Sequence, residues 1–427
     1  MLLLTPQSSA SAMKIEVVKS PGGIEAWLVH EPSLPLIAMQ FSFRGGSAQD
    51  PAGQEGVANF LSAMLDEGAG DLDAQAFQER LEELAVRMNF SSSRDTFSGS
   101  LETLSEYGDQ AFDLLRLALT EPRFDADAVE RIRQSLQSRL AFSLRNPETV
   151  AGRAWSAAAF PGHPYGRPST GTAETLAAIT GDDLRAYRER VFARGNLQVA
   201  VVGDIDADNL GRVLDTVFGG LAATPMLTPV PPIEPVAGGL QKVIEMPLPQ
   251  SVAIFGLQGI ARNDADFMPA FVMNHALGGG GFASRLMEEV REKRGLAYSV
   301  YSYLQPLDSA AIFAGGVATQ NDRIAESLSI IRGELERMAR EGLTEEELKN
   351  SQQYLMGSYA LRFDTNAKIA QQLLGIQNDG YGIDYVKRRN ELVAAVTTAD
   401  IKRVAQRMLD IQDLIVTIVG QPQGLPG

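Results

Sequence analysis

The chain has 427 residues, no cysteine, and 53 acidic against 38 basic side chains, which give a formal net charge of −15. Without cysteine it has no thiol nucleophile, thiolate metal site or disulfide. The negative charge argues against a nucleic-acid partner and against binding to an anionic membrane surface, because proteins bind both through clustered Lys and Arg. A cationic or neutral partner fits this charge better.

The first segment, residues 1–14, reads MLLLTPQSSASAMK. It has a short apolar start and an ASA sequence of the kind that precedes signal-peptide cleavage, but it lacks a basic region and its apolar part is short. Two interpretations stay open. One is a trimmed or atypical export signal, with a periplasmic or otherwise exported protein; the other is a disordered tail on a cytoplasmic one. No apolar run in the chain approaches the roughly 18 residues of a membrane span, so we expect no membrane association.

Residues 15–222 read as a first α+β domain. Apolar residues alternate over residues 37–43 and predict a half-buried strand. The stretch GVANFLSAML, residues 56–65, has an apolar stripe at helical spacing and predicts a core helix. The other flank of this helix carries nothing reactive: it is formed by Asn59, Ser62 and Ala63.

A proline-rich segment, residues 223–239, predicts an extended linker before a second domain over residues 240–427. Residues 179–203 align without a gap with residues 396–420, and seven of the 25 positions are identical. Each segment reads as a capped helix, a turn and a buried strand ending in glycine, so we interpret the halves as a duplicated unit. Runs of strands followed by runs of helices predict an α+β fold with antiparallel sheets and helices packed on one face of each.

Motifs for common chemistry are absent. The three histidines, His30, His163 and His275, lie too far apart for a metal pair on one helix, and we expect surface or packing roles for them. A glycine run precedes Phe282 and consists of Gly278, Gly279, Gly280 and Gly281. The residues before this run read as a helix rather than the strand that a dinucleotide site needs, so a tight turn between helices is the preferred interpretation.

The segment after the glycines predicts a helix that ends near Arg291 and is broken by Gly295, followed by a strand beginning at Tyr298. Alternation along this strand puts Tyr298 on one face with Val300 and Ser302, and puts Tyr301 and Tyr303 on the other. Arg291 and Tyr298 can therefore meet across the turn. Ordinary packing of a basic helix end against an aromatic strand stays open as the alternative.

Two segments carry a resemblance to a known family. LGGGGFASRLMEEVREKRGLAYSVYS, residues 277–302, and FPGHPYGRPSTGTAETLAAITGDDLRAYRERVFARGNLQVAVVGDID, residues 160–206, resemble signatures of the pitrilysin/insulinase zinc peptidases. This family includes mitochondrial processing peptidases and bacterial two-subunit peptidases. The resemblance spans about residues 15–420 and implies two homologous domains that face each other as half of a clamshell.

The resemblance also identifies a degenerate zinc site. The family motif His-x-x-Glu-His falls on Asn59, Ser62 and Ala63, and the family's later glutamate ligand aligns best with Gln137. Catalytic zinc needs three protein donors, a bound water and a carboxylate base, and these four side chains supply neither imidazole nor carboxylate. We therefore expect no metal and no other cofactor in this chain.

The family's second-half pair, by contrast, is kept, because Arg291 and Tyr298 have the family's seven-residue spacing. The resemblance implies that they act on the active site of a homologous zinc-bearing partner with His-x-x-Glu-His, on unfolded peptide substrates. The resemblance also implies that the glycine run shapes the entrance of the chamber or contacts the substrate. Separately, the negative net charge of the chain favours basic peptides as substrates. The alternatives are a homodimer when the chain is alone and a non-proteolytic scaffold or peptide-binding subunit of a larger complex.

Overall fold

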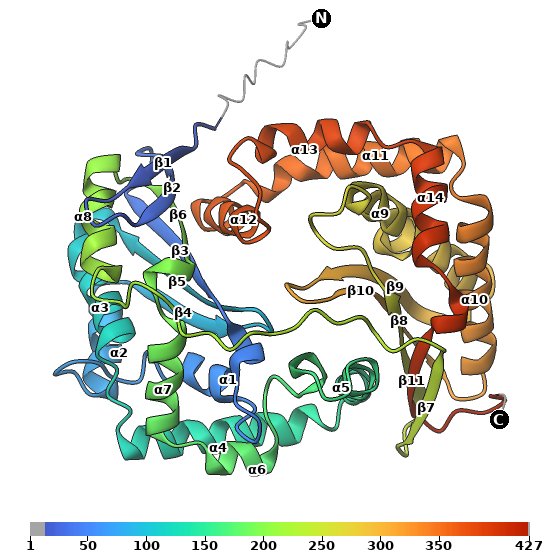
Figure 1. Ribbon diagram of the computed structural model, residues 1–427, viewed down its shortest axis with the longest axis horizontal. Helices are drawn as coiled ribbons and strands as arrows, with labels where there is room; N and C mark the ends of the chain where they lie inside the picture. The colour runs from blue at the N-terminus through green and yellow to red at the C-terminus, as the bar shows by residue number, and fades with distance from the viewer. Residues whose placement is uncertain (1–12, 426–427) are drawn as a thin grey trace, which may run out of the picture.

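The computed structural model describes residues 13–425, and Figure 1 shows two β-sheets that face each other with helices around and between them. The predicted N-terminal tail lies, except for Met13 and Lys14, outside the described residues. Within residues 13–425, no helix has the length and apolar content needed to cross a membrane.

The first sheet has six strands in the order β1-β2-β6-β3-β5-β4. Only β2 and β6 run parallel, and all other neighbours are antiparallel. The predicted strand over residues 37–43 lies within β3, and its alternating apolar side chains are buried. The strand bounds are β1 (Glu16–Lys19), β2 (Glu25–His30), β3 (Leu36–Arg44), β4 (Arg87–Ser92), β5 (Thr96–Leu104) and β6 (Leu197–Gly203).

The second sheet repeats this arrangement in the order β7-β11-β8-β10-β9, and within the described part of the chain it has no counterpart of β1. Here too a single pair, β7 and β11, is parallel. A parallel neighbour requires a long crossover connection, and in each half the helices supply it before the last strand returns. The predicted α+β class is confirmed, with one parallel pair added to each otherwise antiparallel sheet. The bounds are β7 (Leu240–Glu245), β8 (Gln250–Gln258), β9 (Ala297–Pro306), β10 (Ala311–Gln320) and β11 (Ile415–Gly420).

Apart from one helix in each half, the helices of a half pack on one face of its own sheet and form the two main hydrophobic cores. The helices of the first half are α1 (Val57–Ser62), α2 (Ala74–Glu83), α3 (Gly108–Thr120), α4 (Ala126–Ser143), α5 (Pro147–Ala159), α6 (Ala173–Ala178), α7 (Gly181–Val191) and α8 (Ala207–Phe218). Those of the second are α9 (Phe267–Asn274), α10 (Ile324–Glu341), α11 (Glu345–Tyr359), α12 (Asn366–Asn378), α13 (Tyr385–Ala394) and α14 (Thr398–Met408).

The duplication predicted from sequence recurs in structural detail. Helices α7 and α14 occupy equivalent positions of the repeat, and each begins with a capping box, at Thr180 and at Thr397. In both sheets a phenylalanine ring lies over a glycine of the neighbouring strand. A Cβ added to Gly99 would lie 2.2 Å from the Phe41 ring, and one added to Gly315 would lie 2.3 Å from the Phe255 ring. Both positions therefore exclude a side chain.

The second face of each sheet is covered by a helix from the other half, which the sequence analysis did not predict (Figure 1). Helix α12 packs on the first sheet through Leu373 and Leu374, against Ala200 and Val202 of β6. Helix α5 packs on the second sheet, where Trp155 Nε1 donates a hydrogen bond of 3.2 Å to the carbonyl oxygen of Ile415. The central strands are apolar on both faces because both faces are buried.

Residues 223–239 contain no helix or strand and are bonded to both halves. The amide of Thr228 donates to Gln49 Oε1 at 2.7 Å, and the amide of Ile233 donates to the carbonyl oxygen of Ser309 at 2.8 Å. The amide of Val236 donates to the carbonyl oxygen of Ala159 at 3.1 Å. Helices α5 and α12 each pack on the sheet of the other half. Together with these hydrogen bonds, they hold the two halves together as one unit.

Candidate functional site

Helix α1 carries the degenerate zinc positions. Its predicted apolar stripe is confirmed, because Val57, Phe60, Leu61 and Met64 are all buried in the first core. The helix ends at Ser62, whose hydroxyl donates to the carbonyl oxygen of Asn59 at 2.8 Å, and Ala63 is its C-cap. The Ser62 side chain is thus engaged in a local hydrogen bond, and Ala63 packs against the first core.

A buried carboxylate fixes the start of this helix. Asp50 accepts hydrogen bonds from the backbone amides of Gly56, at 2.8 Å, and of Ala58, at 3.0 Å. These are amides at the helix N-terminus that have no partner within the helix. Burial raises the pKa of Asp50 to about 7, although the two amide donors act in the opposite direction. The neighbourhood of α1 is therefore shaped by a capping interaction.

The residues present at the motif positions do not fit a zinc ion. Helix α4, which carries Gln137, packs beside α1, and the guanidinium of Arg133 lies 5.4 Å from the centre of the Phe60 ring. Among residues 13–425 there is no group of three or more His, Cys, Asp or Glu side chains placed to hold a metal. Asn, Ser, Ala and Gln provide no anionic or imidazole donor and no general base.

The second-half pair is in contact. Arg291 lies in the last turn of the helical segment Met287–Glu292. The chain then reverses direction at Gly295, which has a φ of +61°, and continues into β9. The Arg291 guanidinium carbon lies 4.9 Å from the centre of the Tyr298 ring, as the seven-residue spacing predicts, and 4.5 Å from the centre of the Phe282 ring. Both rings are largely solvent-exposed, at 81% for Tyr298 and 69% for Phe282.

Phe282 was missed by the sequence analysis. The available signal was an aromatic residue directly after a glycine run, where the chain turns sharply and a large side chain tends to lie on the surface. Its ring and that of Tyr298 both lie against the Arg291 guanidinium, an arrangement that restricts the orientation of the cation. We call these three residues the Arg291 cluster.

The predicted alternation along β9 is wrong at Tyr298. The pairing of β9 with β10 shifts register between Ala318 and Thr319, so one extra residue is accommodated near the start of β9. Such a bulge interrupts the alternation of side chains. Val300 is buried as a result while Tyr298 is exposed, and the two do not share a face as expected.

The glycine run joins two helical segments, as the preferred interpretation predicted, but most of it lies inside them: Gly278 and Gly279 end the turn His275–Gly279, Gly281 begins the turn Gly281–Ala283, and Gly280 lies between the two. A Cβ on Gly278 would lie 2.4 Å from Ser302 Oγ and 2.6 Å from its backbone nitrogen, so this position needs glycine for close approach to β9. Gly279 and Gly280 approach the preceding helical turn, whereas Gly281, at a φ of +59°, has nothing within 4 Å of an added Cβ. Of the four glycines, Gly278 is the one whose close contacts with β9 leave no room for a side chain.

The histidines have surface or packing roles, as expected. His163 is buried, and its ring bonds the amide of Tyr165 and the carbonyl oxygen of Pro231. His30 lies exposed at the end of β2. His275 stacks on the ring of Tyr354 with a centroid distance of 5.0 Å, and burial lowers its pKa.

Strand β9 is the last strand of its sheet, so one of its edges is unpaired among the described residues. Beyond Tyr298, the rings of Tyr301 and Tyr303 stack with centroids 6.2 Å apart, and both are partly exposed. An exposed sheet edge can pair with an extended peptide through backbone hydrogen bonds. The Arg291 cluster lies at the beginning of this edge.

Comparisons with known proteins agree with these features. Residues 28–173 match the family model described as insulinase (peptidase family M16), and residues 178–355 match the model described as peptidase M16 inactive domain. A Helicobacter pylori protein named non-peptidase homolog YmxG is 26% identical over 90% of this chain and 89% of its own. A Bacillus subtilis protein named uncharacterized zinc protease YmxG is 25% identical over 95% of this chain and 98% of its own.

Solved structures show the same architecture. A crystal structure titled peptidase M16 inactive domain, from Pseudomonas fluorescens, superposes with a TM-score of 0.90 at 28% identity and covers 97% of this chain and 99% of its own. The structure of a Helicobacter pylori protease superposes with a TM-score of 0.86 at 18% identity, covering 95% and 99% of the two chains, and shows the shared fold.

Proposed function

Because the chain belongs to the insulinase family of M16 peptidases and is an inactive homologue within it, we propose that it is the non-zinc subunit of a heteromeric metallopeptidase. The partner is a homologous subunit with an intact His-x-x-Glu-His motif. That subunit would hold the zinc ion, which supplies an activated water for peptide-bond hydrolysis. This chain contributes the Arg291 cluster and half of the chamber wall.

The observation that carries the proposal is the exposure of the Arg291 cluster. A tyrosine kept only for packing is normally covered, yet Tyr298 is 81% exposed while its ring still contacts Arg291. A phenol can donate a hydrogen bond to the oxyanion that forms when water attacks a peptide carbonyl, and a guanidinium can hold a neighbouring carbonyl. The exposure of Tyr298 and its contact with Arg291 support a role for both groups in binding a substrate that enters from outside the chain.

The substrates in this proposal are unfolded peptides bound in extended form along the β9 edge. The tyrosines beyond Tyr298 offer ring surfaces to alternate side chains of such a peptide. The export-signal interpretation of the N-terminal segment would place the complex in the periplasm or outside the cell, and cell fractionation tests this location.

The experiment compares peptide hydrolysis by the chain alone, the zinc-bearing subunit alone and the mixture. We expect activity in the mixture only, and a loss of at least about tenfold for Tyr298→Phe and for Arg291→Ala, since one oxyanion donor typically contributes about 10²-fold or more. Tyr354→Phe is the matched control, because Tyr354 is also an exposed tyrosine but stacks on His275 outside the cluster. Full activity of the Tyr298→Phe mixture would reduce the cluster to a packing feature.

A second candidate function is a scaffold or peptide-binding subunit without a part in proteolysis. The observation that favours it is the name non-peptidase homolog given to the Helicobacter pylori relative. Equal hydrolysis by the zinc-bearing subunit with and without this chain would support the scaffold function over the peptidase function.

A further inference from the structure

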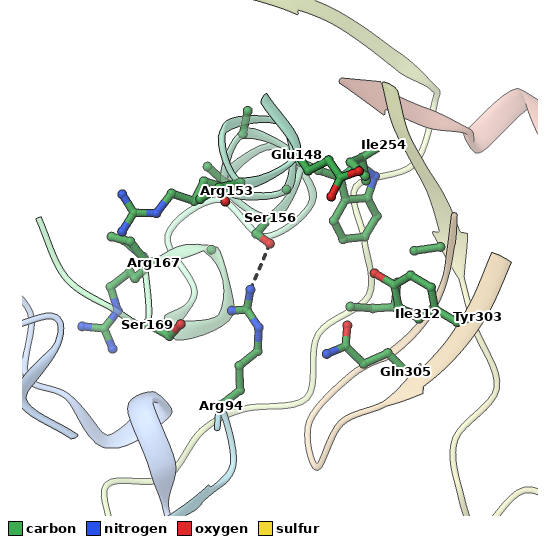
Figure 2. A pocket seen from close by; sticks show the side chains of 18 residues that line it. Arg94, Glu148, Arg153, Ser156, Arg167, Ser169, Ile254, Tyr303, Gln305 and Ile312 are labelled. Carbon is green, nitrogen blue, oxygen red and sulfur yellow. Dashed lines mark hydrogen bonds between the residues drawn. The ribbon is translucent and has the colours of Figure 1, made fainter. Parts of the chain in front are cut away.

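A pocket of about 530 Å³ lies between the two halves, away from the Arg291 cluster. One side is formed by α5, by the segment that follows it, and by Arg94 in the turn between β4 and β5. The other side is formed by strands β8, β9 and β10, with Tyr303 and Gln305 of β9 facing the first side (Figure 2). No role for this pocket follows from the zinc motif or from the Arg291 cluster.

Arg94 is the central cation of the pocket, and its guanidinium is directed into the space between the two sides in Figure 2. It donates to Ser156 Oγ at 2.9 Å and to the carbonyl oxygen of Tyr165, which are both neutral acceptors. A guanidinium has five N–H donors, so donors remain for a ligand after these two bonds. Burial lowers the pKa of Arg94, yet an arginine stays charged at neutral pH.

Charges elsewhere in the lining add to this positive field. Arg153 donates to Thr170 Oγ1 at 2.9 Å and to the carbonyl oxygen of Gly171 at 2.6 Å, again neutral acceptors. Among residues 13–425, Glu148 is the one carboxylate in the lining, and its side chain is exposed. Water screens an exposed charge more than a half-buried one, so Arg94 outweighs Glu148 inside the pocket.

The remaining lining is mostly apolar and aromatic. Ile254 is partly exposed in this lining and packs against the buried side chains of Trp155 and Ile312. A pocket with an apolar wall and a few charged groups, of which Arg94 is the central one, suits a ligand that has an apolar body and a negative charge. Tyr303 joins this pocket to the β9 edge, five residues beyond Tyr298, which is about 17 Å along a strand.

We propose that this pocket binds the carboxylate of an extended peptide, with the carboxylate on Arg94 and an adjacent apolar side chain against Ile254. The carboxylate belongs either to the peptide's C-terminus or to an Asp or Glu side chain, since both present the same two oxygens to a guanidinium. The proposal rests on the proposed peptide-binding function and narrows its substrate class. It departs from the expectation, drawn from the net charge, that basic peptides are preferred.

The test measures binding of N-acetylated octapeptides of one neutral sequence to the purified full chain, without any partner subunit, by calorimetry. One peptide is amidated, one has a free C-terminus, one is amidated with an internal Glu, and one is amidated with an internal Lys. We expect the free-C-terminus or the Glu peptide to bind at least about tenfold tighter than the amidated neutral and Lys peptides, a difference typical of one charge-assisted hydrogen-bonded pair. Tighter binding of the free-C-terminus peptide would identify the C-terminus as the source of the carboxylate, and tighter binding of the Glu peptide would identify a side chain.

Three variants separate the pocket from a general charge effect. Arg94→Gln should abolish the preference, and Glu148→Gln, at an exposed position that does not endanger folding, should strengthen carboxylate binding. Arg340→Gln is the control, because Arg340 is an exposed arginine on α10 that is paired with Glu341 outside the pocket, and it should leave the preference unchanged. Equal binding of all four peptides, or a folded Arg94→Gln variant that keeps the preference, would overturn the proposal.

The binding test is independent of the hydrolysis test. If the mixture hydrolyses peptides through Tyr298 but the isolated chain shows no carboxylate preference, the pocket proposal fails and the proposed function stands. If the carboxylate preference is found and the mixture gains no activity, the pocket binds as proposed and the peptidase function fails.

Discussion

Replacement of Trp155 by alanine tests whether the two halves are interlocked. Trp155 belongs to α5 of the first half, but its side chain, 4% exposed, lies on the second sheet. A Cβ added to Gly256 of β8 would be 2.5 Å from the indole ring, so the ring lies directly over the strand. The indole nitrogen also donates to the carbonyl oxygen of Ile415 in β11. Trp155→Ala removes all of these contacts.

The expected loss in the free energy of unfolding is about 3 to 5 kcal/mol, the range for truncation of a large buried aromatic side chain. Trp155→Phe keeps much of the ring but loses the hydrogen bond, and it should cost about 1 to 2 kcal/mol. The difference between the two variants separates ring packing from the bond to Ile415.

Chemical denaturation with two probes measures the effect. In both variants Trp27, on β2 of the first sheet, becomes the sole tryptophan, and its fluorescence reports on the sheet that α12 covers. Far-UV circular dichroism reports on the whole chain. Because α5 and α12 are exchanged between the sheets, we expect both probes to show one transition, shifted to lower denaturant by the same amount.

The reasoning would be refuted by two separate transitions in which the Trp27 signal stays at its original midpoint. That result would mean that the first sheet and α12 remain folded when α5 loses its contact with the second sheet. The halves would then be independent domains joined by the proline-rich segment.

Three further predictions concern the site. Tyr298→Phe should change the free energy of unfolding by less than about 0.5 kcal/mol, because the side chain is exposed, and a larger loss in chemical denaturation would assign it to packing. Gly278→Ala should destabilise by about 1 to 3 kcal/mol in the same measurement because its Cβ would clash with Ser302, whereas Gly333→Ala, in open space on α10, should not. Burial raises the pKa of Asp50 from 3.8 to about 7, so the folded state holds a proton that the unfolded state releases between about pH 4 and 7. The free energy of unfolding of the original chain, relative to that of Asp50→Asn, should therefore be highest below about pH 4 and should fall by up to about 1.4 kcal/mol per pH unit as the pH rises to 7. A difference between the two chains that does not change with pH would contradict a buried, protonated carboxyl group.

Local patterns in the sequence determined much of the fold. The alternation in β3, the apolar stripe of α1 and the capped helices α7 and α14 all appear where the sequence predicts them. Contact between Arg291 and Tyr298 was also predictable, because only a short turn separates them in the chain. Such features depend on residues a few positions apart, and the sequence records them directly.

The tertiary structure alone decided how distant segments combine. Nothing in the local sequence of α5 or α12 indicates which sheet each helix covers. The bulge that exposes Tyr298 depends on the register between β9 and β10, which is set by pairing along two whole strands. The pocket around Arg94 joins a turn of the first half to α5 and to Tyr303 of the second half. These contacts arise only when the chain closes on itself and both faces of each sheet must be buried, because that requirement acts on the whole molecule rather than on any one segment.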